Sequence, residues 1–535
     1  MRPSFAVEES VRTLGANLKA ARLRRRLPQS VVAERAGISL NTLSKLENGD
    51  CGIAIGNVAS VLQALGLGTP FSDVAAAGDD ETGLMLEARR RPRRARQPKK
   101  EICAKMRSPS LRLYEIRARW LPGDPLIGRL AVPLSTGPRS GTLQDPGASP
   151  AQAARAAAVM RFQYDGDWVE SGVPLGADLP LEHGVLRPRL GKSAFGFLED
   201  RAISAPVFSI FNDPASPLSG LPEGAGRLET TALLLPHRTD SLGALSVTPV
   251  DVDPLPERPR VKRQSELPEL IYAYHAMERG KAGSDEVSLL QNGLTLPGRR
   301  PVFTVERHRE AQTARLRSML DPIDRPLWMH MALVAANRCG ICTVETDLEH
   351  EMGENILFTR RADRRGANAD APADKPLLTL TGATLAARQE SPRPVPPGYL
   401  ALADILNGGG AAPKEDLPQM WRRIAFQLLT GGAGDSLNRW QFHREPLGWR
   451  LSPAHTLEWN PSAQGRGLTM DGRRRLSCAD DAIPYARYFG LTVSDAKGIL
   501  MEMRRILSGW EGLAEEFGAD PRDIAYMAPL FEENL

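Results

Sequence analysis

The spacing of apolar residues predicts a series of short helices at the start of the chain. Apolar side chains recur every three or four residues, as on one face of a helix, in two stretches. The first consists of Val11, Leu14, Leu18 and Ala21, and the second of Ile55, Val58, Val61, Leu62 and Leu65. Between them, residues 29–49 predict two shorter helices joined by a tight turn. Gly37 suits that turn because glycine adopts the left-handed backbone that a sharp turn requires. We therefore expect an all-α unit over residues 1–68.

The second of these short helices predicts a polar outer face. Ser39 is a suitable N-cap, and Leu43 and Leu46 point inward at helical spacing. The outward positions carry mostly small polar or basic groups, which suit base edges and phosphates, namely Leu40, Asn41, Thr42, Ser44, Lys45 and Asn48.

This pattern resembles the lambda-repressor-like (Cro/C1-type) helix-turn-helix family, including the closing residues Leu46-Glu47-Asn48-Gly49. The resemblance implies a double-stranded DNA operator as partner, bound as a homodimer on paired half-sites. We expect Asn41 and Thr42 to contact bases, and Gln29, Ser30 and Lys45 to contact phosphates. A small all-helical adaptor domain is the alternative.

Beyond residue 68 the pattern changes three times. Residues 69–105 predict an acidic, then basic, linker, in which eight of the twelve residues from Arg89 to Lys100 are Arg or Lys. Such a run is usually solvated. Because this one lies next to a predicted DNA-reading domain, contact with DNA phosphates is an equally good interpretation. Residues 106–265 show the alternation of strands, as in Leu111–Ala118 and in 158–164 before a turn at Asp165. Residues 266–535 predict mostly helices, among them 327–336, 421–429 and 497–517.

Composition narrows the class of protein. A chain of 535 residues should hold about three or four domains, and no apolar run is long enough to span a membrane. The polar N-terminus and only five cysteines favour the cytoplasm over a disulfide-bonded secreted protein, and we expect no membrane partner. The net charge of +4 is modest, so contacts with nucleic acid must come from local patches. No metal site is expected, because the histidines lack ligand spacing and the Cys339-Cys342 pair stands alone.

Residues 106–535 resemble one family throughout, the HipA-type serine/threonine kinases of toxin–antitoxin systems. The matching segments occur in the family's order, at residues 162–172, 282–290, 449–457 and 485–510. The helix-turn-helix unit in front resembles HipB, the DNA-binding antitoxin of those systems. The resemblance implies a multidomain fusion, in which an all-α domain precedes an α+β protein-kinase-like fold with an N-terminal subdomain (106–265) and a core with a mostly helical C-terminal lobe (266–535).

The residues expected to carry out phosphoryl transfer are replaced. The reaction needs cations on the nucleotide phosphates, carboxylates on magnesium and a base near the acceptor hydroxyl. The family's two lysines align with Val287 and Val305, its catalytic base with Ala433 and its metal-binding aspartate with Thr456. Asn438 aligns with the asparagine that binds the metal in the family, and Asp435 aligns with a histidine of the family.

We therefore expect a DNA-binding autoregulator of toxin–antitoxin type, with a catalytically inactive HipA-like half and no cofactor. The alternative is an active serine/threonine kinase toxin that uses Mg-ATP, with Asp435 as base and Glu458 as metal ligand. A third hypothesis is a decaying gene product, which the intact helix-turn-helix pattern and the unbroken apolar stripes disfavour.

Overall fold

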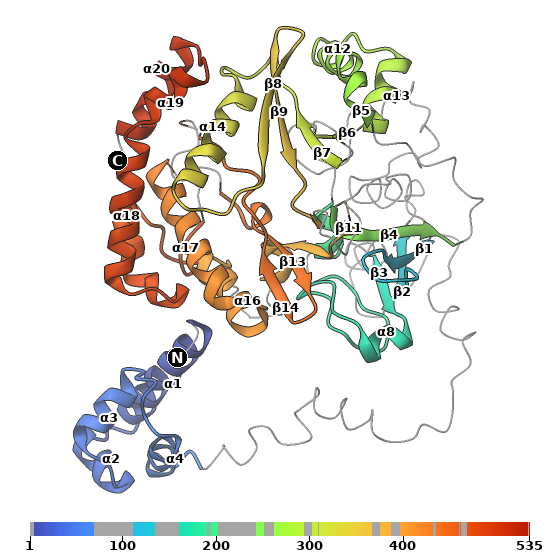
Figure 1. The fold of residues 1–535 in the computed structure, drawn as a ribbon. Coiled ribbons are helices and arrows are strands. Elements are labelled where there is room, and N and C mark those ends of the chain that lie inside the picture. Colours follow the sequence, from blue (N-terminus) through green and yellow to red (C-terminus); the bar gives the residue numbers. More distant parts are fainter. Residues whose placement is uncertain are drawn as a thin grey trace. The chain divides into compact units, whose positions relative to one another are not determined.

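The chain forms two compact units, Met1–Lys99 and Lys100–Leu535 (Figure 1). The computed structural model describes residues 5–68, 111–133, 160–189, 192, 194–201, 242–250, 262–293, 302–308, 310–365, 375–386, 396–431, 435–459, 461, 468–532 and 534–535. The basic run at 89–100 and position 433 lie outside these residues. Each unit is described by itself.

The N-terminal unit contains the helices α1 (Phe5–Arg24), α2 (Gln29–Ala36), α3 (Leu40–Glu47) and α4 (Ile55–Ala64). This confirms the predicted all-α domain. Its core is built from the apolar stripes of the sequence and includes Leu18, Val32, Leu43, Leu46 and Val61. Gly37 ends α2 with φ of 66°, as the turn requires.

Two glycines allow α1 to lie directly against the end of α3. A Cβ atom on Gly15 would lie 2.4 Å from the carbonyl oxygen of Leu46, and one on Gly49 would lie 2.5 Å from the Cα of Arg12. Gly49 also has φ of 78°, which favours glycine. The close approach of α1 and α3 therefore depends on both residues lacking a side chain.

The second unit begins with a four-stranded antiparallel sheet of order β3-β2-β1-β4. Its strands are β1 (Leu111–Ala118), β2 (Leu126–Pro133), β3 (Arg161–Tyr164) and β4 (Leu245–Pro249). The predicted turn at Asp165 is wrong: its carboxylate accepts a hydrogen bond from the Asp167 backbone N–H and caps the helix α8 (Gly166–Ser171). An Asp-Gly pair is compatible with either structure, and the burial of Trp168 and Val169 on α8 favours the helix.

A five-stranded sheet of order β5-β6-β7-β9-β8 follows. Its strands are β5 (Lys262–Arg263), β6 (Phe303–Arg307), β7 (Glu310–Arg315), β8 (Thr346–Glu351) and β9 (Glu354–Arg360), and the helices α12 (Leu267–Glu278) and α13 (Ser284–Gly293) accompany it. Side chains of α12 and α13 form one hydrophobic core with β6, β7 and β9. A smaller sheet consists of β12 (Thr379–Thr381), β13 (Gln441–Glu445) and β14 (Gly448–Leu451).

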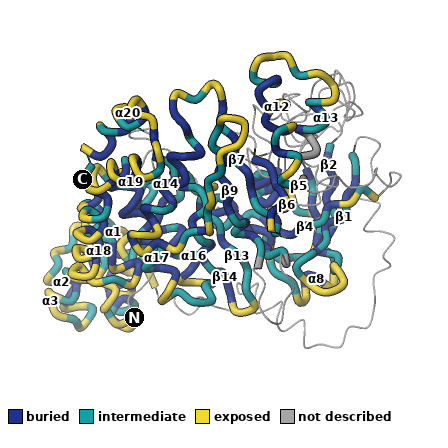
Figure 2. The backbone as a smooth tube through the Cα atoms, turned by 45° about the horizontal axis from the view of Figure 1, so that its top comes forward, coloured by how far each residue is buried: buried dark blue, intermediate teal, exposed yellow. Residues whose placement is uncertain are grey.

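The C-terminal part is mostly helical, as expected for this fold class. Helix α14 (Arg325–Arg338) buries ten of its fourteen residues, α17 (Pro413–Leu429) buries ten of seventeen and α16 (Tyr399–Gly409) buries five of eleven (Figure 2). The last helices are α18 (Val493–Leu507), α19 (Trp510–Glu516) and α20 (Pro521–Glu532).

The single helix predicted over 497–517 is wrong, because the chain bends between α18 and α19. Ser508 and Gly509, which are poor helix formers, lie at the bend. The bend allows the Trp510 ring to stack on Phe531 of α20, with ring centroids 4.4 Å apart.

Candidate functional sites

Helix α3 presents a polar face above a buried apolar one. Leu43 and Leu46 are 0% and 1% exposed, whereas Ser39, Asn41, Lys45 and Asn48 are exposed. Leu40 is also exposed, and Thr42 and Ser44 are partly exposed. The predicted inward and outward positions are therefore the observed ones.

The start of α3 is fixed by its own side chains. The Ser39 hydroxyl accepts a hydrogen bond from the Thr42 backbone N–H at 3.0 Å, as the predicted N-cap should. The Thr42 hydroxyl lies 2.8 Å from that of Ser39, so it is already engaged in the unbound protein. Asn41, next to it, is exposed and its amide has no such local partner among the described residues.

A buried ion pair that sequence analysis missed holds α3 to α1. The Arg22 Nε donates to Glu47 at 2.5 Å, and a second guanidinium nitrogen donates at 2.9 Å. The Gln29 amide also donates to Glu47, at 2.8 Å, so this predicted phosphate contact has an internal partner. Burial alone would raise the pKa of Glu47, but the hydrogen bonds from Arg22 and Gln29 lower it below its usual value. Glu47 therefore stays charged and links three helices.

In the second unit, the two positions that align with the family's lysines are core positions. Val287 on α13 and Val305 on β6 are 3% and 0% exposed and belong to one hydrophobic cluster. A lysine at either place would need a charged partner or a path to solvent. Valine carries no charge, so neither side chain can supply the positive charge that a lysine would place on a nucleotide phosphate.

Asp435 lies in the protein interior rather than in an open site. Its carboxylate accepts hydrogen bonds from the Tyr399 hydroxyl at 2.7 Å and from the Trp440 Nε1 at 3.0 Å. A third bond comes from the Ser436 backbone N–H. Burial raises the pKa of Asp435, and these donors only partly oppose that effect. The arrangement is that of a structural carboxylate.

The two predicted metal-ligand segments do lie side by side, but a salt bridge joins them. Glu458 accepts from Arg439 at 2.9 Å and pairs with Arg325 at 3.0 Å. Asn438 is exposed and Thr456 is partly exposed. Glu458 is not in a strand, since β14 ends at Leu451.

These residues do not fit a divalent cation. Magnesium is held by oxygen ligands, usually one or two carboxylates. The only carboxylate of this group is Glu458, and two guanidinium groups occupy it. Across the described residues, no group of three His, Cys, Asp or Glu side chains is arranged to hold a metal ion.

His330 and Cys339 are buried side chains, and neither they nor His455 belong to a metal site among the described residues. His330 packs edge-on against Phe517, and burial lowers its pKa. Burial also lowers the pKa of His455, to about 4, so its ring is neutral at physiological pH. Cys339 is buried where α14 ends, and Cys342 is exposed.

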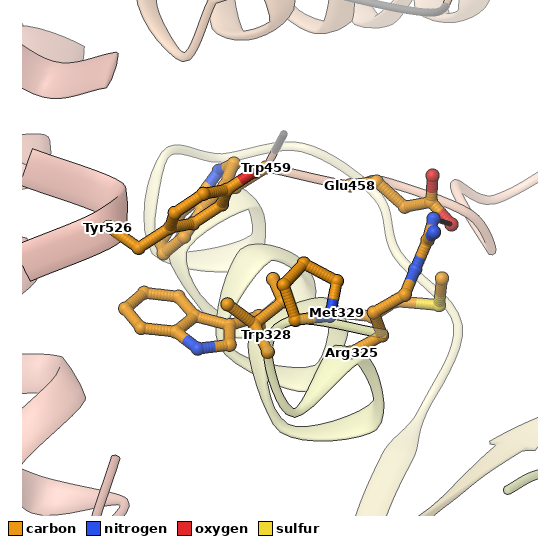
Figure 3. Close-up of a pocket in the computed structure, with 8 residues that line it drawn as sticks. Arg325, Trp328, Met329, Glu458, Trp459 and Tyr526 are labelled. Atoms are coloured by element: carbon orange, nitrogen blue, oxygen red, sulfur yellow. Dashed lines mark ion pairs between the residues drawn. The ribbon is translucent and has the colours of Figure 1, made fainter. Parts of the chain in front are cut away.

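A cavity of about 220 Å³ lies beside the salt bridge of Glu458 (Figure 3). Arg325 and Glu458 form one wall, and the aromatic rings of Trp328, Trp459 and Tyr526 contribute others. The Trp459 Nε1 is buried and has no hydrogen-bond partner among the described residues. Sequence analysis did not find this cavity, because its residues come from three segments distant in the chain.

No described helix is long and apolar enough to cross a membrane.

Two family models match separate parts of the chain. A helix-turn-helix domain model matches residues 13–70, and a HipA-like C-terminal domain model matches residues 328–510. No curated protein sequence matches the chain. Among solved structures, the chain is similar to one from the Shewanella oneidensis MR-1 toxin–antitoxin complex of HipA, HipB and its operator DNA. That similarity has 16% identity and a TM-score of 0.46, and covers 79% of this chain and 95% of the other.

Proposed function

We propose that this chain, a fusion of a helix-turn-helix domain with a HipA-like domain, is a sequence-specific DNA-binding autoregulator of toxin–antitoxin type. In this proposal the HipA-like half does not transfer phosphate. It serves instead as a folded platform for dimerisation or docking.

The observation that carries the proposal is the exposed polar face of α3 on an intact helix-turn-helix core. Asn41 and Lys45 project from the helix, whereas Leu43 and Leu46 anchor it. In this class of domain the second helix enters the major groove and its first residues reach base edges. Asn41 is the best-placed side chain for base contact, since asparagine forms paired hydrogen bonds with adenine.

The inactive state of the HipA-like half is supported by what its residues do in the fold. Val287 and Val305 are core side chains, Asp435 accepts hydrogen bonds from Tyr399 and Trp440 in the interior, and Glu458 is held by two arginines. The alternative kinase would need Asp435 as a base and Glu458 as a metal ligand. Asp435 would have to break its hydrogen bonds to Tyr399 and Trp440. Glu458 would have to break its ion pairs with Arg325 and Arg439.

The proposal is tested by selecting duplexes from a random pool with the full-length chain. We expect enrichment of a palindromic sequence, bound by two chains, because helix-turn-helix dimers read two half-sites one helical turn apart. The stoichiometry is measured by light scattering of the complex. If no sequence is enriched over random duplex, the proposal fails.

A further inference from the structure

The first turn of α3 carries a large apolar side chain at its surface. Leu40, the first residue of this helix, is 53% exposed, whereas the other two leucines of α3, Leu43 and Leu46, are buried in the core of the N-terminal unit. The core therefore does not require a leucine at position 40. The exposed surface of Leu40 is in contact with water, and a binding partner would remove that unfavourable contact.

The charge around Leu40 suits nucleic acid. Helix α3 has no acidic residue in its first turn, and Lys45 is exposed on the same helix. The acidic residue of α3, Glu47, is buried and paired with Arg22. No exposed residue of α3 therefore carries a negative charge that would repel the phosphates of DNA.

The position of Leu40 in the helix directs its side chain toward the bases in the proposed complex. In an α-helix the Cα–Cβ bonds tilt toward the N-terminus, so side chains of the first turn lean forward from the helix end. In helix-turn-helix complexes the N-terminal residues of the second helix reach the base edges. The hydroxyl groups of Ser39 and Thr42 lie 2.8 Å apart and are hydrogen-bonded to each other. Leu40 and Asn41 are therefore the side chains of this turn that are best placed to meet a base.

A leucine side chain can distinguish bases in only one way. It has neither a hydrogen-bond donor nor an acceptor, so it cannot recognise the polar edges of adenine, guanine or cytosine. The methyl group of thymine is the apolar group that a base pair presents in the major groove. Against a polar edge, Leu40 would displace water without supplying a hydrogen bond, which is unfavourable.

We propose that Leu40 is a specificity-determining residue that contacts the methyl group of a thymine in each half-site of the operator. The inference rests on the proposed DNA-binding function and deepens it, because it names the base that one side chain reads. Asn41, the next residue, is suited to adenine. Each half-site should therefore contain A·T pairs where the first turn of α3 meets the major groove.

The test replaces single thymines of the selected operator with deoxyuridine, which removes the methyl group and keeps the base pairing. Binding of the full-length chain to each duplex is measured at one salt concentration. We expect one thymine in each half-site at which the replacement weakens binding about three- to fivefold, as for the loss of one buried methyl group. Replacement of thymines outside the operator should have no effect.

Two variants assign this effect to a side chain. Leu40→Ala should bind the thymine and deoxyuridine duplexes equally, because it no longer reaches the methyl group. The control is Leu23→Ala, which truncates a leucine of α1 that is 57% exposed, and it should keep the full difference between the duplexes. Thermal unfolding shows that each variant is folded.

An equal sensitivity to deoxyuridine in Leu40→Ala and in the wild type would mean that another residue reads the methyl group, and would overturn the inference. Association of two chains is measured alongside. Weaker association of Leu40→Ala, with its sensitivity to deoxyuridine unchanged, would assign Leu40 to a protein contact instead. If an operator is selected but none of its thymines responds, this inference fails and the proposed function stands. If no operator is selected, both fail.

Discussion

Asn41 and Glu47 lie on the same short helix, yet one is exposed and the other is 5% exposed. The difference separates two kinds of mutation in the N-terminal unit. A change at Asn41 alters the surface that would meet DNA and leaves the core intact. A change at Glu47 alters the ion pair that holds α1, α2 and α3 together.

Replacing Asn41 with alanine should relax sequence preference. Removal of its hydrogen bonds to a base is expected to cost about 1–3 kcal/mol on the preferred operator and almost nothing on random duplex. The measurement is the ratio of the two dissociation constants at one salt concentration. Asn17→Ala, at an exposed position of α1, is the control. A variant at Asn41 with an unchanged ratio would rule out this residue as a base contact.

Replacing Glu47 with glutamine should destabilise the N-terminal unit by about 3 kcal/mol, because it leaves Arg22 charged, buried and unpaired. The measurement is urea unfolding of a fragment of residues 1–99, which forms a compact unit with its own core. Glu34→Gln, at an exposed position of α2, is the control.

The same pair predicts the pH dependence of this unit. The pKa of Glu47 is lower in the folded protein than in the unfolded chain. Its contribution to stability is therefore present above the unfolded pKa of about 4.3, and is lost as the pH falls through the folded value. The acid-induced loss of stability should be smaller in Glu47→Gln. An equal loss in the two proteins would mean that other groups cause it.

Among the elements, those with regular apolar spacing were predictable from sequence. Strand β1 matches the predicted residues 111–118, and α14 and α17 contain the helices predicted at 327–336 and 421–429. The bend between α18 and α19 was missed although Ser508 and Gly509, which are poor helix formers, mark it in the sequence. The ion pair of Arg22 with Glu47 was missed because nothing local in the sequence links the two residues.

The basic run from Arg89 to Lys100, for which the structure gives no description, carries a prediction at this scale. We expect it to add affinity for DNA of any sequence, because each phosphate neutralised releases counterions. Replacing it with a Gly-Ser segment of equal length should make the plot of log K against log salt shallower, by about 0.9 for each phosphate that the run neutralises. An unchanged slope would mean that the run is only a tether.

For the whole molecule, the prediction is that the purified chain does not turn over ATP. The resemblance to HipA-type kinases implies that the replacements at positions 287, 305, 433 and 456 act on one transition state, so any one of them should cost about a hundredfold or more in rate. The measurement is transfer of label from ATP, with magnesium and a cell extract. Asp435→Asn is assayed alongside, with its fold checked by circular dichroism. Robust transfer that disappears in this variant would establish displaced catalysis and overturn the proposed function.

The contact between α1 and α3 through Gly15 and Gly49 also has a genetic consequence. Every missense codon at these positions adds a Cβ atom that would overlap backbone atoms of the facing segment. In a selection for loss of the proposed repression, such alleles should therefore lower the amount of folded protein and behave as recessive. Alleles at Asn41 leave the fold intact. If the chain acts as a dimer, they should form mixed pairs with the wild-type product and behave as dominant.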